Sequence, residues 1–212
     1  MLLRCMESSI KVNNVRSNSK GKAMDMTLEK HLHNLAKNID YSLRIHSAKY
    51  ILVASDCSGE GKSLFLSECT PVLNYIYKKR ILIYDCQTER DDLLEKTMAP
   101  VSSATQFIRN TMTPGLDYLH SDDLSFLKSL PEDKKASTLM AHFNEVTKDY
   151  DVVFINMKTL KRAEKTTLPI LPIDGAILIR SAKSMGLQEK YITNELTDRE
   201  IPIIGLVKNE GI

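Results

Sequence analysis

The chain has 212 residues, of which 29 are Lys or Arg and 27 are Asp or Glu, and its formal net charge is +2. This size, with 42% hydrophobic residues, predicts one globular domain with a short appendage, and the balanced charge argues against a nucleic-acid binder. The four cysteines form no CxxC pair, and no apolar run reaches the roughly 18 residues of a transmembrane segment. We therefore expect no metal cluster or disulfide framework, and a cytoplasmic location.

Residues 1–26 are polar and show no sustained apolar periodicity. We expect them to form a flexible N-terminal arm, which is either a solvated tail or a weak contact for an anionic membrane surface. From Thr27 onward, leucine and isoleucine recur every three to four residues, which predicts an amphipathic helix ahead of the first strand. The folded domain is therefore assigned to residues 27–212.

Five short apolar segments alternate with helical patterns along this domain. The apolar segments cover residues 49–54, 80–85, 150–156, 174–180 and 201–207, and helices are expected up to residue 78, over 135–148 and over 185–196. Residues 99–131 are irregular, with a small strand expected at 116–119. This alternation predicts an α/β fold, a mostly parallel, doubly wound sheet with helices on both faces. Ligands of such sheets bind beyond the carboxyl ends of the strands.

A glycine-rich turn with the composition of a phosphate-binding loop follows the first strand and precedes a helix. Its glycines leave backbone N–H groups for a phosphate, Lys62 can reach the outer phosphates, and the Ser63 hydroxyl can bind magnesium. The full loop pattern has Gly at the place of Asp56. The order of strand, turn and helix still favours nucleotide binding over a plain helix N-terminus. The predicted nucleotide-binding residues of the loop are Ser58, Gly59, Glu60, Gly61, Lys62, Ser63 and Leu64.

Together these segments resemble the bacterial tyrosine kinases (BY-kinases) of capsule and exopolysaccharide synthesis, which belong to the MinD/ParA class of deviant P-loop ATPases. The resemblance covers about residues 33–210 and is carried by segments 51–63, 80–85, 150–156, 174–180 and 204–209. It implies a P-loop NTPase fold that binds ATP or ADP with Mg²⁺. It further implies that Lys62 and Asp85 are catalytic, that Ser63 and Asp85 hold the metal, and that Asn209 lies beside the adenine ring.

Two of the three acidic positions of that family carry amides in this chain. The family has Asp-x-Asp at the end of the second strand and Asp at the end of the third, whereas this chain has Asp85, Gln87 and Asn156 there. An amide oxygen binds magnesium weakly and cannot act as a general base. The resemblance therefore implies a degenerate member, a pseudokinase that binds adenine nucleotide weakly and regulates polysaccharide synthesis or export through protein contacts.

The family's assembly features are altered as well. Its Glu-x-x-Arg-x-x-Arg motif corresponds here to Lys30, His33 and Ala36, so a ring oligomer formed through that motif is not expected. The last tyrosine is Tyr191, so we expect no tyrosine-rich tail as a phosphorylation substrate. The partner that the resemblance implies is the cytoplasmic segment of a membrane-embedded polysaccharide co-polymerase, a chain-length regulator, which would recruit the chain to the inner face of the cell membrane.

Three alternatives stay open from the residues. An active tyrosine kinase or ATPase requires that Asp85 suffices or that a partner supplies the missing acids. A MinD- or ParA-like positioning ATPase normally has a signature Lys near Asp56 and Cys57, where this chain has none. A structural module without nucleotide is favoured by Asp56, because an inward-pointing carboxylate would repel phosphate.

Overall fold

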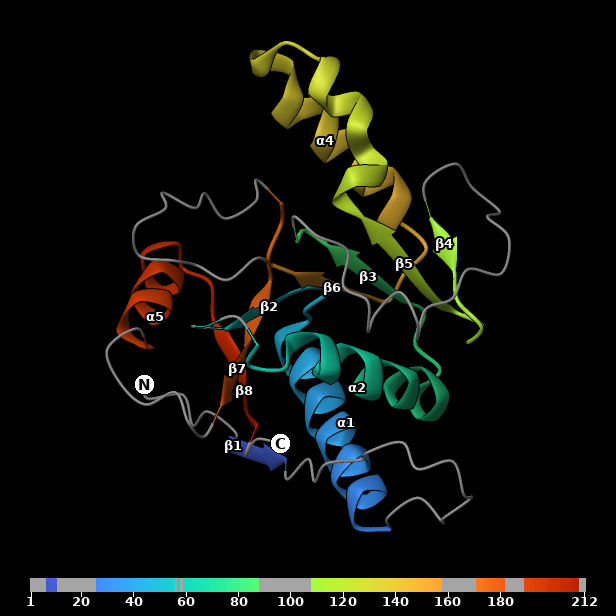
Figure 1. Cartoon of the computed structure of the whole chain (residues 1–212), viewed down its shortest axis with the longest axis vertical. Coiled ribbons are helices and arrows are strands. Elements are labelled where there is room, and N and C mark those ends of the chain that lie inside the picture. The colour runs from blue at the N-terminus through green and yellow to red at the C-terminus, as the bar shows by residue number, and fades with distance from the viewer. Residues whose placement is uncertain are drawn as a thin grey trace.

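The computed structural model describes residues 7–10, 26–55, 57, 59–87, 108–157, 171–181 and 189–209. Within these residues, eight strands form one sheet in the order β1-β8-β7-β2-β6-β3-β5-β4 (Figure 1). All neighbouring strands are parallel except β4, which is antiparallel to β5. The strands are β1 (Glu7–Ile10), β2 (Tyr50–Ser55), β3 (Ile81–Asp85), β4 (Arg109–Asn110), β5 (Leu116–His120), β6 (Val152–Asn156), β7 (Gly175–Ser181) and β8 (Ile203–Asn209). The predicted mostly parallel sheet is confirmed.

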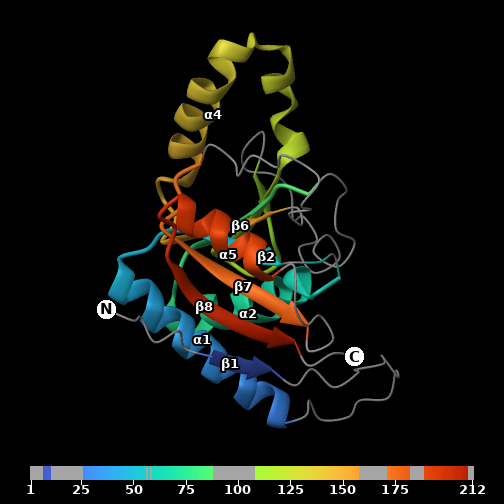
Figure 2. The same cartoon turned by 90° about the vertical axis from the view of Figure 1, so that its left-hand side faces the viewer.

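Helices cover both faces of the sheet, as Figures 1 and 2 show. The first face is covered by α1 (Met26–His46) and α2 (Lys62–Tyr77), and the second by α5 (Glu189–Asp198) and the C-terminal half of α4 (Glu132–Thr147). The 3-10 segment η1 (Ser121–Ser129) precedes α4, and the two extend away from the sheet at the top of both views. The predicted doubly wound arrangement is therefore confirmed.

The continuous apolar character of the central strands follows from this double covering. Side chains of a strand alternate between its two faces. In β2, Ile51 and Val53 belong to the core under α1 and α2, whereas Leu52 and Ala54 belong to the core under α4 and α5. Each residue of the strand interior thus buries its side chain on one face or the other.

The strand β1 corrects the expectation of a flexible arm for Glu7–Ile10. These residues pair in parallel with β8, in a register that runs from Glu7 opposite Leu206 to Ile10 opposite Asn209. Without β1, β8 would expose an edge of unpaired N–H and C=O groups, and a short extended segment satisfies them. The remaining parts of the predicted arm, residues 1–6 and 11–25, lie outside the described residues.

The strand register aligns three polar residues across the carboxyl end of the sheet. Asn156 of β6 is opposite Asp85 of β3, and Asp85 is opposite His120 of β5. Two residues earlier in each strand, Phe154, Ile83 and Tyr118 belong to the core under α1 and α2. Because side chains two residues apart share a face, Asn156, Asp85 and His120 lie on the α2 side of the sheet. This row borders the turn that enters α2.

Candidate functional site

The predicted phosphate loop connects β2 to α2, and its glycines have backbone conformations that few other residues adopt. Gly59 has φ +80° and Gly61 has φ +100°, both in the left-handed region. Gly61 is the N-cap of α2, and no side chain among the described residues caps this helix. The first-turn N–H groups and the helix dipole therefore favour an anion at this end. Ser63 and Leu64 lie in that first turn, whereas Ser58 and Asp56 lie outside the described residues.

Lys62 is the first residue of α2 and bonds to the end of β2. Its Nζ donates to Ser55 Oγ at 2.7 Å, and Ser55 Oγ donates to the Cys57 carbonyl at 2.9 Å. Lys62 and Ser55 are both buried, with 7% and 2% of their surface exposed. The ammonium group is thus held beneath the loop, where a bound phosphate would compete with the Ser55 hydroxyl for it.

The Glu60 residue ties the loop to the ends of two further strands. Its Oε2 accepts from the Cys57 N–H at 2.9 Å, and its Oε1 accepts from the Ser181 N–H at the end of β7 at 3.4 Å. Its carbonyl accepts from Asn209 Nδ2, at the end of β8, at 3.0 Å. A Cβ placed on Gly61 would lie 2.6 Å from that same Asn209 nitrogen. The structure therefore places Asn209 against the loop, and its contact with adenine stays a prediction.

The Asp85 carboxylate lies fully buried at the end of β3 and is surrounded by protein donors. Its Oδ1 accepts from the Gln87 N–H and from Asn156 Nδ2, both at 3.1 Å, and its Oδ2 accepts from the Tyr118 hydroxyl at 2.9 Å. The side-chain oxygen of Asn156, Oδ1, is buried and has no hydrogen-bond partner among the described residues. The two amide positions inferred from the sequence are thus brought to Asp85, Gln87 through its backbone and Asn156 through its side chain.

The neighbours of Asp85 on β3 and just after it are held in their neutral forms. Burial raises the pKa of the Cys86 thiol, and the charge of the Asp85 carboxylate raises it further. Burial likewise raises the pKa of the Tyr84 hydroxyl, with further contributions from Cys86 and Asp85. Cys86 is therefore a thiol at neutral pH rather than a nucleophilic thiolate.

The donor set around Asp85 does not fit a magnesium ion held by the protein. Magnesium prefers near-octahedral oxygen ligands, chiefly carboxylates, phosphates and water. Asp85 brings a carboxylate that already accepts three hydrogen bonds, and Asn156 brings a neutral amide oxygen. In the described parts of the chain, no three side chains of His, Cys, Asp or Glu gather as metal ligands. The metal-binding role predicted for Ser63 and Asp85 gains no support from these contacts.

Sequence reasoning missed three residues that contact the predicted site: Ser55, Tyr118 and Ser181. Ser55 and Ser181 are the last residues of β2 and β7, so extending the search to the final residue of every central strand would have found both. Tyr118 gave no such signal, because it lies two residues before the end of β5. Its contact with Asp85 depends on the pairing of β5 with β3, which periodicity does not reveal.

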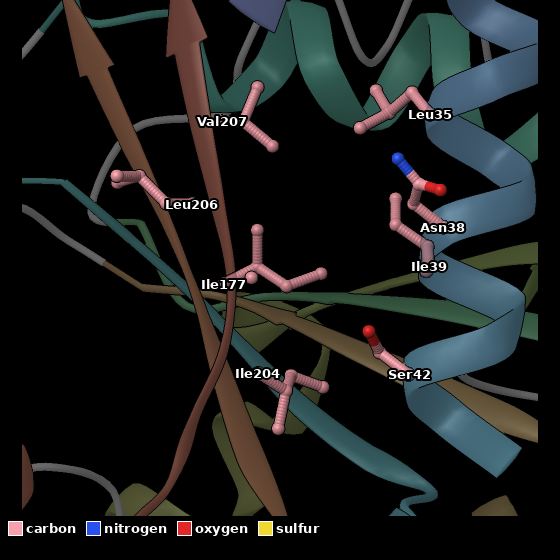
Figure 3. Close-up of a pocket in the computed structure, with 9 residues that line it drawn as sticks. Leu35, Asn38, Ile39, Ser42, Ile177, Ile204, Leu206 and Val207 are labelled. Atoms are coloured by element: carbon pink, nitrogen blue, oxygen red, sulfur yellow. The ribbon is translucent and has the colours of Figure 1, made fainter. Parts of the chain in front are cut away.

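A small pocket lies elsewhere, between α1 and the strands β7 and β8 (Figure 3). In the close-up, Asn38 and Ser42 reach into it from α1, opposite aliphatic side chains that include Ile177 and Ile204. Its mainly aliphatic lining does not suit a phosphate or a metal ion, so this pocket does not extend the loop site.

Solved structures with the same fold include tyrosine kinase domains. The kinase domain of the Escherichia coli tyrosine kinase ETK has a TM-score of 0.65 and 11% identity, over 97% of this chain and 89% of that chain. The chimerical protein CapA2B2 has a TM-score of 0.62 and 15% identity, over 96% and 93%. The BceF tyrosine kinase domain has a TM-score of 0.59 and 18% identity, over 86% and 77%. No protein-family model and no curated protein sequence matches the chain.

These comparisons establish that the chain has the fold of bacterial tyrosine kinase domains, which confirms the fold implied by the resemblance. At such low identities the likeness defines the fold, and the chemistry has to be argued from this chain's own residues. Each helix in the described part of the chain is too short or too polar to cross a bilayer.

Proposed function

We propose that this chain is a degenerate BY-kinase-like P-loop protein that binds adenine nucleotide weakly and acts mainly through protein contacts. The observation that carries the proposal is the contrast between the two halves of the site. The loop has the glycine conformations, the buried Lys62 and the uncapped helix N-terminus that suit a phosphate. The strand ends carry Gln87 and Asn156 where catalysis in the family uses carboxylates.

In this proposal Lys62 exchanges its bond to Ser55 for a phosphate oxygen, and the Gly61, Lys62 and Ser63 amides bind the phosphates at the helix N-terminus. The ligand would be ATP or ADP, and the Ser63 hydroxyl would lie beside its phosphates in the first turn of α2. A neutral amide at position 156 cannot accept the proton of an attacking hydroxyl, so transfer would be slow or absent. Bound nucleotide would then act by stabilising one conformation of the protein, and it would not be consumed as a substrate.

The test of nucleotide binding is thermal unfolding of the wild type and of Lys62→Ala, with and without millimolar ADP or ATP. A ligand at 100 times its Kd adds about 2.7 kcal/mol to the free energy of unfolding. We expect a rise in Tm for the wild type that Lys62→Ala loses. Lys148→Ala is the matched control, because this lysine is exposed and lies at the C-cap of α4, outside the loop. The absence of any shift in the wild type would reject nucleotide binding.

We further propose that the regulated process is exopolysaccharide or capsule synthesis, and that the partner is the cytoplasmic segment of a membrane-embedded polysaccharide co-polymerase. The support is the shared fold with bacterial tyrosine kinase domains. Calorimetric titration with peptides of such segments from the same organism tests it. We expect binding that ADP strengthens or weakens, whereas no binding in either state would reject this partner. Steady hydrolysis of ATP or tyrosine phosphorylation would favour an active enzyme instead.

A further inference from the structure

The contacts of Asp85 bear on whether the nucleotide site requires a metal ion. Both carboxylate oxygens accept hydrogen bonds from protein groups, and Asp85, Asn156 and Tyr118 are each fully buried. Buried carboxylates are stable only when donors or counter-charges replace their lost water. A magnesium ion that used Asp85 would have to reach a fully buried carboxylate and compete with the donors that now stabilise its charge.

The packing of its ring holds Tyr118 in place. Its ring belongs to the core under α1 and α2 and lies beside the His120 ring, with centroids 6.5 Å apart. Turning the hydroxyl away from Asp85 would therefore leave a void in a close-packed core and an under-bonded carboxylate. Tyr118 thus holds Asp85 in the resting fold and is not a mobile gate.

Asn156 contributes in two ways. At a position where the resembled family has a charged Asp, it places a neutral amide next to Asp85. Its Nδ2 also donates a hydrogen bond to Asp85 Oδ1 at 3.1 Å. In the part of the chain that the structure describes, no group bonds to the buried Asn156 Oδ1. A single neutral oxygen suits a buried water better than magnesium, which favours anionic oxygens.

We propose that Tyr118 and Asn156 make Asp85 a structural carboxylate instead of a metal ligand, so that nucleotide binding at the loop does not depend on a divalent cation. This inference rests on the proposed nucleotide binding and specifies its metal requirement. Tyr118 is a positioning residue, since it acts through Asp85.

The experiment compares the wild type, Tyr118→Phe and the control Tyr84→Phe. Tyr84 is the matched control because, like Tyr118, it is a buried tyrosine near Asp85. It precedes Asp85 on β3, and its side chain belongs to the core on the opposite face of the sheet. Thermal unfolding is measured in EDTA and in millimolar Mg²⁺ without nucleotide, and ADP affinity is measured in both buffers by calorimetry. These readouts do not require enzymatic activity.

For the wild type we expect Mg²⁺ to leave Tm unchanged and to alter the Kd for ADP by less than about threefold. In EDTA, Tyr118→Phe should unfold about 4 °C lower, because a hydrogen bond to a charged group is lost. Mg²⁺ should restore part of that loss, since the released Asp85 Oδ2 becomes a ligand. Tyr84→Phe should show no response to Mg²⁺.

Two results would overturn the inference. One is a wild type whose ADP affinity rises about tenfold or more with Mg²⁺, and the other is a Tyr118→Phe variant whose Tm responds to Mg²⁺ no more than that of Tyr84→Phe. If ADP binds to none of the proteins, the proposed nucleotide binding fails. The Mg²⁺ response of Tyr118→Phe without nucleotide still decides the role of Tyr118 in that case.

Discussion

The phosphate loop and the Asp85 cluster lie at the same edge of the sheet, but they are held in different ways. The loop is positioned by groups at the ends of β2, β7 and β8, which bond to Lys62, Glu60 and the Glu60 carbonyl. Asp85 is enclosed instead by donors from β5, β6 and its own turn, with none of its surface exposed. The first arrangement leaves the N-terminus of α2 without a side-chain cap among the described residues, and in the second the carboxylate is hydrogen-bonded within the fold.

In the proposed function, this difference separates nucleotide binding from catalysis within one site. Two carboxylates at positions 85 and 156 would repel each other unless a metal or a proton lay between them. With Asn156, the same pair becomes an attractive hydrogen bond of 3.1 Å that needs no metal. The neutral Asn156 then stabilises this strand end, whereas Lys62 and Glu60 of the loop bond to the ends of other strands.

The largest effect is expected from a substitution that disrupts the hydrogen bonds of Asp85. Asp85→Asn replaces one acceptor oxygen by an NH₂ group among three donors, so at least one buried donor loses its partner. We expect the free energy of unfolding in urea to fall by about 3 kcal/mol. Asp149→Asn, at an exposed position, is the control and should change stability by less than about 0.5 kcal/mol. Equal stabilities of the two variants would show that Asp85 does not stabilise the fold.

A smaller effect is expected on the loop side. Gly61→Ala places a Cβ 2.6 Å from Asn209 Nδ2 at a φ of +100°. The Cβ of Gly59→Ala, at φ +80°, meets no atom of the described residues within 4 Å. We expect losses of about 2 kcal/mol for Gly61→Ala and about 1 kcal/mol for Gly59→Ala, because only the first adds a clash to the backbone strain. Urea unfolding of both variants measures the difference. If Gly59→Ala costs as much as Gly61→Ala, Asn209 is not packed against the loop.

The fold could be predicted because its signals are local. The apolar runs 49–54, 80–85, 150–156, 174–180 and 201–207 each contain most of a central strand, and the glycines of the loop mark the turn into α2. The strand β1 escaped prediction because four residues of a polar segment carry no periodicity, and because its formation depends on the free edge of β8.

The site could be predicted only in part, for a different reason. Lys62, Asp85 and Asn156 were found because they sit at ends of strands or helices, which the sequence reveals. The Tyr118 hydroxyl reaches Asp85 from 33 residues away, through the pairing of β3 with β5. Such a contact requires the strand order, and the order of strands in a parallel sheet is set by tertiary packing rather than by local pattern.

The smallest effect is expected at Asn209. The resemblance assigns this residue to the adenine ring, whereas the structure places its side chain against the loop. Asn209→Ala removes the 3.0 Å bond to the Glu60 carbonyl, so we expect a loss of about 1 kcal/mol in the free energy of unfolding. Lys208→Ala, at the exposed neighbouring position, should have a smaller effect. Calorimetry with ADP and GDP then separates the two roles of the side chain. If Asn209 positions the loop, Asn209→Ala should lower the affinities for ADP and GDP alike, because both nucleotides bind through the same phosphates. If Asn209 instead contacts the base, the substitution should lower the affinity for ADP alone.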